Sequence, residues 1–235
     1  MTFKTDLEST VKEIFESEWT EREGKVVPDL KGLSLDNDAV KLNATVLYAD
    51  IADSTNLVDR YSHQQHFAAE IYKAYLRCAA RIIKNEQGII TAYDGDRVMA
   101  VFLRNSKNTS AVRSALMINY AVLAIINPLL KSQYRGKTYQ LKHVVGVDTS
   151  ELFVARIGVR KDSDLVWVGR AANYAAKLCN LNGEYSTYIT GKVYDSMDED
   201  VKYGGKDNSL IWDKVVWPAR NTMRIYGSTR MWEIT

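Results

Sequence analysis

The chain has 235 residues, of which 31 are Lys or Arg and 29 are Asp or Glu, so its net charge is close to neutral. This balance argues against a protein that binds nucleic-acid duplexes, because such proteins usually carry a dense basic face. The length suits one large domain with short appendages and is sufficient to bury a substantial core.

The cysteine and hydropathy patterns indicate a protein of a reducing, aqueous compartment. Cys78 and Cys179 belong to no Cys-x-x-Cys or Cys–His motif, so we expect a cytoplasmic protein without a structural zinc ion. The N-terminus lacks the apolar segment of a signal peptide. The most apolar stretch, 116–130, is interrupted by Asn and Pro residues and is shorter than the roughly 20 residues of a membrane span, so we expect no membrane association.

The chain begins with a helical pattern that stands apart from the rest. Residues 5–17 carry apolar side chains at helical spacing, and a polar connector with Gly and Pro follows over 19–37. We therefore predict an N-terminal helix and linker over 1–40, followed by one domain over 41–235.

That domain alternates strand and helix patterns. The predicted elements are a strand over 43–51, a long helix over 56–84, a hairpin over 88–103, a second long helix over 108–127, two hairpin-like strands over 138–148 and 151–157, a strand over 165–168, a helix over 170–181, a strand over 185–190, and a tail with a short helix and one or two strands. The order β-α-β-β-α-β is that of an α+β, ferredoxin-like fold, here with a C-terminal extension and an N-terminal helix.

Two carboxylates stand where strands end. Asp50 closes the apolar run 44–51, and Asp96 lies in an Asp-Gly-Asp sequence between two further apolar runs, which is a strong hairpin signal. If the strands are neighbours, the two carboxylates meet at one sheet edge. Carboxylate oxygens suit Mg²⁺ or Mn²⁺, which bind few carboxylates and leave positions for substrate phosphates. The pair therefore indicates chemistry on a nucleoside triphosphate.

Each carboxylate also has a structural explanation when it is taken alone. Asp53, Ser54 and Thr55 are candidates for the N-cap of the helix that follows Asp50, and hairpin turns are rich in Asp and Gly for backbone reasons. The two acidic sites together, each beside an apolar strand, are hard to obtain by chance. We therefore favour one shared functional site.

No other catalytic motif stands out. The sequence contains neither a Walker loop nor a recognisable nucleophile motif with Ser or Cys. His63 and His66 have no acidic cluster near them and are expected on the surface, whereas His143 lies in a strand pattern and is expected to be structural.

Three segments together resemble the class III nucleotidyl cyclases, which include adenylate and guanylate cyclases. The segment from Asp50 to Thr55 resembles the first metal motif of that family, although Asp53 and Ser54 replace its usual Gly and Phe. Gly95-Asp96 through Phe102 resembles the second metal motif closely. The run from Gly169 to Lys177 resembles the third motif, and the three motifs span about two thirds of the chain.

The resemblance implies roles for these residues. Asp50, the Ile51 carbonyl and Asp96 would hold two divalent cations, Mn²⁺ or Mg²⁺. Asn173 would orient the ribose, and Lys177, where the family usually has Arg, would place a cation on the phosphates with less geometric specificity than a guanidinium. Arg224, Arg230 or Lys192 would grip the terminal phosphates. The family also implies an antiparallel homodimer whose active sites form between subunits.

The positions that read the base differ from those of the purine cyclases. Those enzymes place polar residues where this chain has Ala92 and Val166, and a buried purine edge left unpaired would cost roughly 1–3 kcal/mol per group. Tyr48, Tyr93, Arg97 and Asp94 are available to recognise a base differently.

This loss resembles the pyrimidine cyclases of bacterial Pycsar anti-phage systems, which make cyclic UMP or cyclic CMP as a signal read by a separate effector. UTP is favoured over CTP on the resemblance only. Two alternatives stay open: an adenylate cyclase with atypical base recognition, and an inactive cyclase-like nucleotide sensor.

Overall fold

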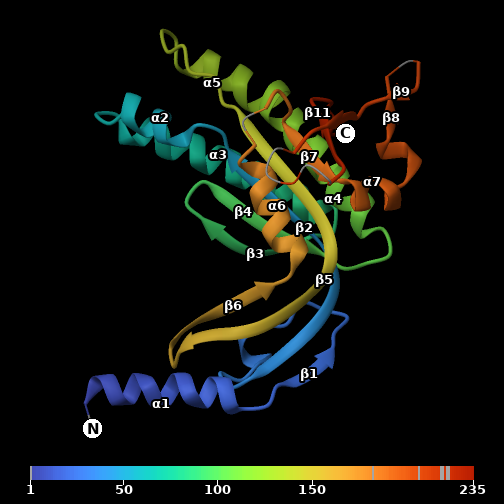
Figure 1. Cartoon of the computed structure of the whole chain (residues 1–235). Helices are drawn as coiled ribbons and strands as arrows, with labels where there is room; N and C mark the ends of the chain where they lie inside the picture. Colours follow the sequence, from blue (N-terminus) through green and yellow to red (C-terminus); the bar gives the residue numbers. More distant parts are fainter. Residues whose placement is uncertain (1, 182, 206, 218–219, 221–222) are drawn as a thin grey trace.

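The computed structural model describes residues 2–181, 183–205, 207–217, 220 and 223–235. In this part of the chain, a nine-stranded sheet has the order β10-β11-β7-β5-β2-β4-β3, with β1 paired to β2 and β6 paired to β5 (Figure 1). Its strands are β1 (Thr20–Glu23), β2 (Asp38–Ile51), β3 (Ile89–Asp94), β4 (Arg97–Phe102), β5 (His143–Val159), β6 (Asp162–Val168), β7 (Thr187–Thr190), β10 (Asp213–Val215) and β11 (Ile225–Ser228). The pairs are antiparallel except β1–β2 and β5–β7. The predicted α+β order is confirmed.

The helices cover both faces of the sheet. They are α1 (Phe3–Glu16), α2 (Ser54–Arg60), α3 (Gln65–Asn85), α4 (Lys107–Tyr120), the π-helical segment η2 (Ala121–Ile126), α5 (Asn127–Gln133), α6 (Arg170–Cys179) and α7 (Gly191–Ser196); the short 3₁₀ turns η1 (Leu30–Gly32) and η3 (Glu199–Val201) and a small hairpin, β8 (Tyr203–Gly204) with β9 (Ser209–Leu210), complete the list. Helices α3 and α4 pack on one face of the sheet, and α6 packs on the other.

Alternation along β2 assigns its residues to these two faces. Leu47, Ala49 and Ile51 belong to the core under α3 and α4. Val46 belongs to the core under α6, and Tyr48 packs against that core. Because successive strand residues point to opposite faces, Asp50 lies on the α6 face with Tyr48.

β2 and β5 are longer than predicted and extend out of the body of the molecule. Their distal halves pair with each other, with β1 and with β6 to form an arm that carries α1 at its end (Figure 1). The sequence predicted no strand in the connector, yet β1 forms there because the edge of β2 offers free hydrogen-bonding groups. All four of its side chains are exposed, so no hydrophobic pattern marks it.

Three predicted boundaries were wrong. The helix predicted over 56–84 is two helices, broken between Arg60 and Gln65. The helix predicted to stop at 127 continues to Gln133, because the chain stays helical through the π-helical segment η2 and into α5, whose first turn contains Pro128. The hairpin predicted around 149–150 is instead one continuous strand, β5, which pairs antiparallel with β2 and with β6.

The helical segment Lys107–Gln133 is long and apolar enough to be considered as a membrane span. It is a core helix instead, since two thirds of its most apolar window is buried against the sheet and α3. This burial explains its composition without a lipid environment.

His143 at the start of β5 makes folding sensitive to acid. The side chain is only 5% exposed, and burial lowers its pKa from 6.5 to about 4. The unfolded chain therefore binds a proton that the folded protein excludes, so we expect the contribution of His143 to lower the free energy of unfolding by about 3 kcal/mol as the pH drops from 6.5 to about 4.

Urea unfolding at several pH values measures this effect. His143→Gln should remove that part of the pH dependence, whereas His63→Gln, at an exposed position as predicted, should keep it. Parallel pH curves for the wild type and His143→Gln would contradict the assignment.

Candidate active site

The two predicted metal-binding carboxylates come together at the ends of β2 and the β3–β4 hairpin. Asp50 pairs with Arg97 across β2 and β4, and the hairpin turns through Gly95 and Asp96. Gly95 has φ +59°, a left-handed conformation that glycine adopts without steric cost. Asp96 is therefore part of the turn itself, rather than the first residue of the strand that follows.

The carboxylate pair is held in a partly desolvated setting. Arg97 donates two hydrogen bonds to Asp50 Oδ2, from Nε at 3.0 Å and from Nη2 at 2.7 Å. Burial raises the pKa of Asp50, and the nearby Asp96 charge raises it further, while the Arg97 guanidinium opposes both effects. The two carboxylates therefore lie near each other, and the positive charge of the Arg97 guanidinium partly neutralises them.

Two buried oxygens of this pair have no partner. Among the described residues, neither Asp50 Oδ1 nor Asp96 Oδ2 is hydrogen-bonded, although both atoms are buried. Unsatisfied buried carboxylate oxygens are costly, and a hard divalent cation is the group that satisfies them. The residues therefore fit Mg²⁺ or Mn²⁺. The described residues contain no cluster of three or more His, Cys, Asp or Glu that could hold a metal ion.

The residues considered for base recognition lie close to this pair. Tyr48 is half-buried two residues before Asp50, and the Arg97 guanidinium lies 6.0 Å from its ring centroid. Ala92 on β3 packs against the same core as Tyr48. Tyr93 is 56% exposed, so it is less able than Tyr48 to restrict a pocket.

Helix α6 presents the residues of the third motif on its exposed face. Asn173 and Lys177 are one turn apart and both exposed, while Ala171 and Ala175 are buried against the sheet. The helix lies so close to β5 that a Cβ at Gly146 would come within 2.1 Å of the Ala175 carbonyl oxygen. At its C-terminal end, the Cys179 thiol donates to the Tyr48 carbonyl at 3.1 Å.

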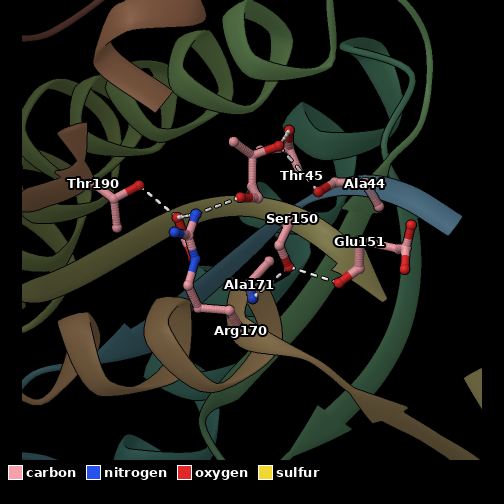
Figure 2. A network of polar contacts seen from close by, with 9 residues as sticks. Ala44, Thr45, Ser150, Glu151, Arg170, Ala171 and Thr190 are labelled. Atoms are coloured by element: carbon pink, nitrogen blue, oxygen red, sulfur yellow. Dashed lines mark hydrogen bonds and ion pairs between the residues drawn. The ribbon is translucent and has the colours of Figure 1, made fainter. Parts of the chain in front are cut away.

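A buried polar network fixes the start of α6, and sequence reasoning missed it. Arg170, labelled in Figure 2, donates two hydrogen bonds to Asp148 on β5, with Nε 3.1 Å from Oδ2 and Nη2 3.2 Å from Oδ1. Thr190 donates to the same carboxylate at 2.5 Å, and the Ser150 hydroxyl accepts the Ala171 N–H at 2.9 Å. Asp148 has no exposed surface, and burial raises its pKa despite these donors.

This network explains why polar residues occur within β5. The predicted strands over 138–148 and 151–157 left Thr149 and Ser150 between them, but in the structure both hydroxyls are hydrogen-bonded inside the fold. The available sequence signal was the polar run 148–150 within an apolar stretch, together with Arg170 in the third motif. The arrangement positions the helix that carries Asn173 and Lys177.

Two predicted substrate-binding residues lie elsewhere within the single chain. Val166 is on β6, separated from Ala92 on β3 by β5, β2 and β4 in the sheet. Arg224, just before β11, forms an exposed ion pair with Asp195 of α7. The single chain thus brings together Asp50, Asp96, Arg97 and Tyr48. In the part of the chain that the structure describes, no hydrogen bond or ion pair joins this group to Asn173, Lys177, Val166 or Arg224.

Comparison with known proteins identifies the family. The sequence is 48% identical over 235 residues to a uridylate cyclase of Xanthomonas perforans, covering 100% of both chains. It is also 48% identical over 238 residues to a uridylate cyclase of Burkholderia cepacia, again with 100% of both covered. The chain belongs to the uridylate cyclase family.

The solved structures agree with this assignment at the level of the fold. The guanylyl cyclase Cya2 superimposes on the cyclase with a TM-score of 0.66 at 16% identity, covering 82% of this chain and 94% of that one. No family model matches the sequence. The cyclase therefore has the class III cyclase fold, and the 48% identity to the two curated relatives assigns it to the nucleotidyl cyclases, as the three motifs predicted.

Proposed function

We propose that this cyclase converts UTP to 3′,5′-cyclic UMP and pyrophosphate. The observation that carries the proposal is the full-length identity of 48% to two proteins named uridylate cyclase. The site supports it, because the carboxylate pair is retained while Ala92 and Val166 stand where purine cyclases read the base. CTP is the alternative pyrimidine substrate.

The residues take the following roles in this proposal. Asp50, the Ile51 carbonyl and Asp96 hold two divalent cations, Mg²⁺ or Mn²⁺, which supply Lewis acidity for attack of the ribose 3′-oxygen on the α-phosphorus and for the departure of pyrophosphate. Asn173 orients the ribose. Lys177 stabilises charge on the phosphates, where a fixed cation in a water-poor site is most effective.

The remaining residues contact the base and the terminal phosphates of the substrate. Tyr48 and Arg97 line the base pocket with Ala92, and Tyr93 borders it. Val166 lies on β6, away from these residues in the single chain, and would join the pocket from a second subunit. Arg224 binds the terminal phosphates and would have to leave Asp195 to do so. Positioning then provides most of the rate, because the nucleophile and the phosphorus belong to one molecule.

One assay tests the reaction directly. The purified protein is incubated with UTP, CTP, ATP or GTP and Mn²⁺, and the products are identified by mass spectrometry. We expect cyclic UMP as the main product. Cyclic AMP as the main product would favour an adenylate cyclase with atypical base recognition, and no product from any nucleotide would favour a sensor.

We further propose that the active unit is a homodimer with composite sites. In the single chain Asn173 and Lys177 are exposed and form no hydrogen bond or ion pair with the carboxylate pair among the described residues. A second subunit that brings its α6 face to the Asp50–Asp96 edge would complete each site.

Mixing two inactive variants tests this arrangement. Asp50→Ala and Asn173→Ala subunits should, after exchange, recover about one quarter of wild-type activity, because half of the dimers are mixed and each has one of two sites intact. Exchange is verified independently with two differently tagged chains. If exchange occurs and activity stays at background, each site lies within one chain.

The biological role follows from the product. We propose a cytoplasmic enzyme that produces a cyclic pyrimidine nucleotide during phage infection, and a separate effector protein that binds this nucleotide. The resemblance of the motifs to anti-phage pyrimidine cyclases supports this role. Cyclic UMP should rise in infected cells that carry the wild type and stay at baseline in cells that carry Asp96→Ala.

A further inference from the structure

Helix α1 exposes an apolar stripe that nothing in its own chain covers. Phe3, Leu7, Val11, Ile14 and Phe15 recur at helical spacing, and Phe15 is 82% exposed. None of the 14 residues of α1 is buried. A helix of this length is only marginally stable in water and normally depends on packing of its apolar face.

The attachments of α1 to the arm leave this stripe free. Asn37 donates from Nδ2 to the carbonyls of Ile14 and Ser17, at 2.9 and 2.8 Å. These bonds hold the C-terminal end of the helix by its backbone. The apolar side chains still need a partner.

A groove on the opposite end of the molecule has the matching character. It lies between α3 and the η2–α5 segment, has a volume of about 260 Å³, and is lined mainly by apolar side chains, including Ala74, Cys78, Ile125 and Leu129. Leu129 is 65% exposed. Covering this groove with apolar side chains would remove Leu129 and its neighbours from water, which is favourable.

The charges beside the two surfaces are complementary. α1 carries Asp6, Glu8, Glu13 and Glu16 against two lysines. On α3, Lys73, Arg77 and Arg81 are exposed beside Ala74 and Cys78. No ion pair in the described part of the chain involves these three basic residues. Opposite charges of this kind set the orientation and partner of a docked helix.

The chain cannot fill its own groove. α1 lies at the end of the arm, whereas α3 and α5 lie at the far end of the body (Figure 1). Only residues 17–19 separate α1 from β1, and β1 is hydrogen-bonded to β2. An acidic helix face also disfavours an anionic membrane surface.

We propose that α1 of one subunit docks its apolar stripe into the α3–α5 groove of a second copy of this chain. In a two-fold arrangement each helix fills the groove of the other subunit, so both uncovered surfaces are buried and the assembly closes. This inference concerns the arm and the outer groove, and it stands independently of the substrate and of the composite site.

A native cysteine allows a direct test. Cys78 lines the groove and is partly exposed, while Cys179 is buried. Val11→Cys places a second thiol in the middle of the stripe, and a short bismaleimide should then link most of the protein into covalent dimers on a denaturing gel. Mass spectrometry should identify the link between residue 11 and Cys78. Labelling with a monofunctional maleimide confirms that both thiols react.

Control variants test whether the cross-link depends on the apolar stripe of α1 and on Cys78 of the groove. Ser9→Cys, on the opposite side of α1, should give no more dimer than the wild type, and adding Cys78→Ser to Val11→Cys should abolish the link. Leu129→Asp should lower the yield about tenfold, as expected when a buried leucine becomes a charge, without changing thermal unfolding.

Two outcomes would overturn the proposal. Dimers that persist in the Val11→Cys, Cys78→Ser protein would show that α1 pairs with α1. The absence of dimers, with both thiols reactive, would show that no second copy covers the stripe; binding of the same protein to phosphatidylcholine–phosphatidylglycerol vesicles would then identify a membrane as the partner.

Discussion

Replacing Asp96 by Ala is expected to lower turnover by at least about a thousandfold, as is common when a charge-stabilising ion is lost from an active site. Asp50→Ala should have the same effect. Both carboxylates place an unpaired buried oxygen at one edge of the sheet, so the loss of either leaves a cation with too few ligands. Cyclic nucleotide formation under saturating UTP and Mn²⁺ measures this change.

Controls separate this effect from unfolding. Asp59→Ala removes an exposed carboxylate from the neighbouring helix α2 and should retain full activity. Asp50→Asn is the isosteric variant, because Asp50→Ala also leaves Arg97 without its partner. A chelator should reduce the wild type to the same background, reversibly on addition of Mn²⁺. Robust activity in a folded Asp96→Ala protein would refute the assignment.

The second large effect concerns selection of the base. We expect kcat/KM for UTP to exceed that for ATP or GTP by at least about a hundredfold, since a pocket that leaves polar edges unpaired rejects the wrong ligand strongly. Tyr48, half-buried beneath Arg97, is the side chain best placed to occupy the space of a purine. Tyr48→Ala should therefore reduce the preference, whereas Tyr93→Ala, at a more exposed position, should change it less.

The polar residues of the purine enzymes should not restore purine activity by themselves. Ala92→Lys with Val166→Asp is expected to lose activity on UTP without gaining much on ATP, because polar groups are added while the space stays closed. The four kcat/KM values are compared under one metal condition. A wild-type preference for ATP or GTP would show that the two apolar positions have another meaning.

The sequence was informative where one residue type serves one local purpose. The strand before Asp50 and the hairpin at Gly95 follow from alternation and turn chemistry, so the meeting of the two carboxylates could be predicted. The arm could not, because the four side chains of β1 are exposed, and this strand is held by backbone pairing with β2 and by the ion pairs Arg22–Asp38 and Glu21–Lys41 rather than by an apolar pattern.

The strand β5 shows a second limit of sequence reasoning. Asp148, Thr149 and Ser150 are acceptable inside a sheet because groups distant in the sequence satisfy them: Arg170 and Thr190 bond to Asp148, the Ala44 carbonyl accepts from Thr149, and the Ala171 N–H donates to Ser150. Composite sites are a third limit, since one sequence does not say which copy supplies Asn173. Tertiary and quaternary contacts thus overrode local preference at these positions.

The number of residues in β2 fixes the orientation of the arm relative to Asp50, because side chains alternate between the two faces of the sheet along a strand. Asp50 lies at one end of this strand, and Asp38–Lys41, which pair with β1, lie at the other. Because side chains alternate, inserting one residue into the distal half would turn the outer part of the strand over and present β1 and α1 to the opposite side, whereas inserting two would preserve their orientation. Natural or engineered length changes in this part of β2 should therefore be tolerated in even steps, and an odd step should misdirect α1 while leaving Asp50 in place.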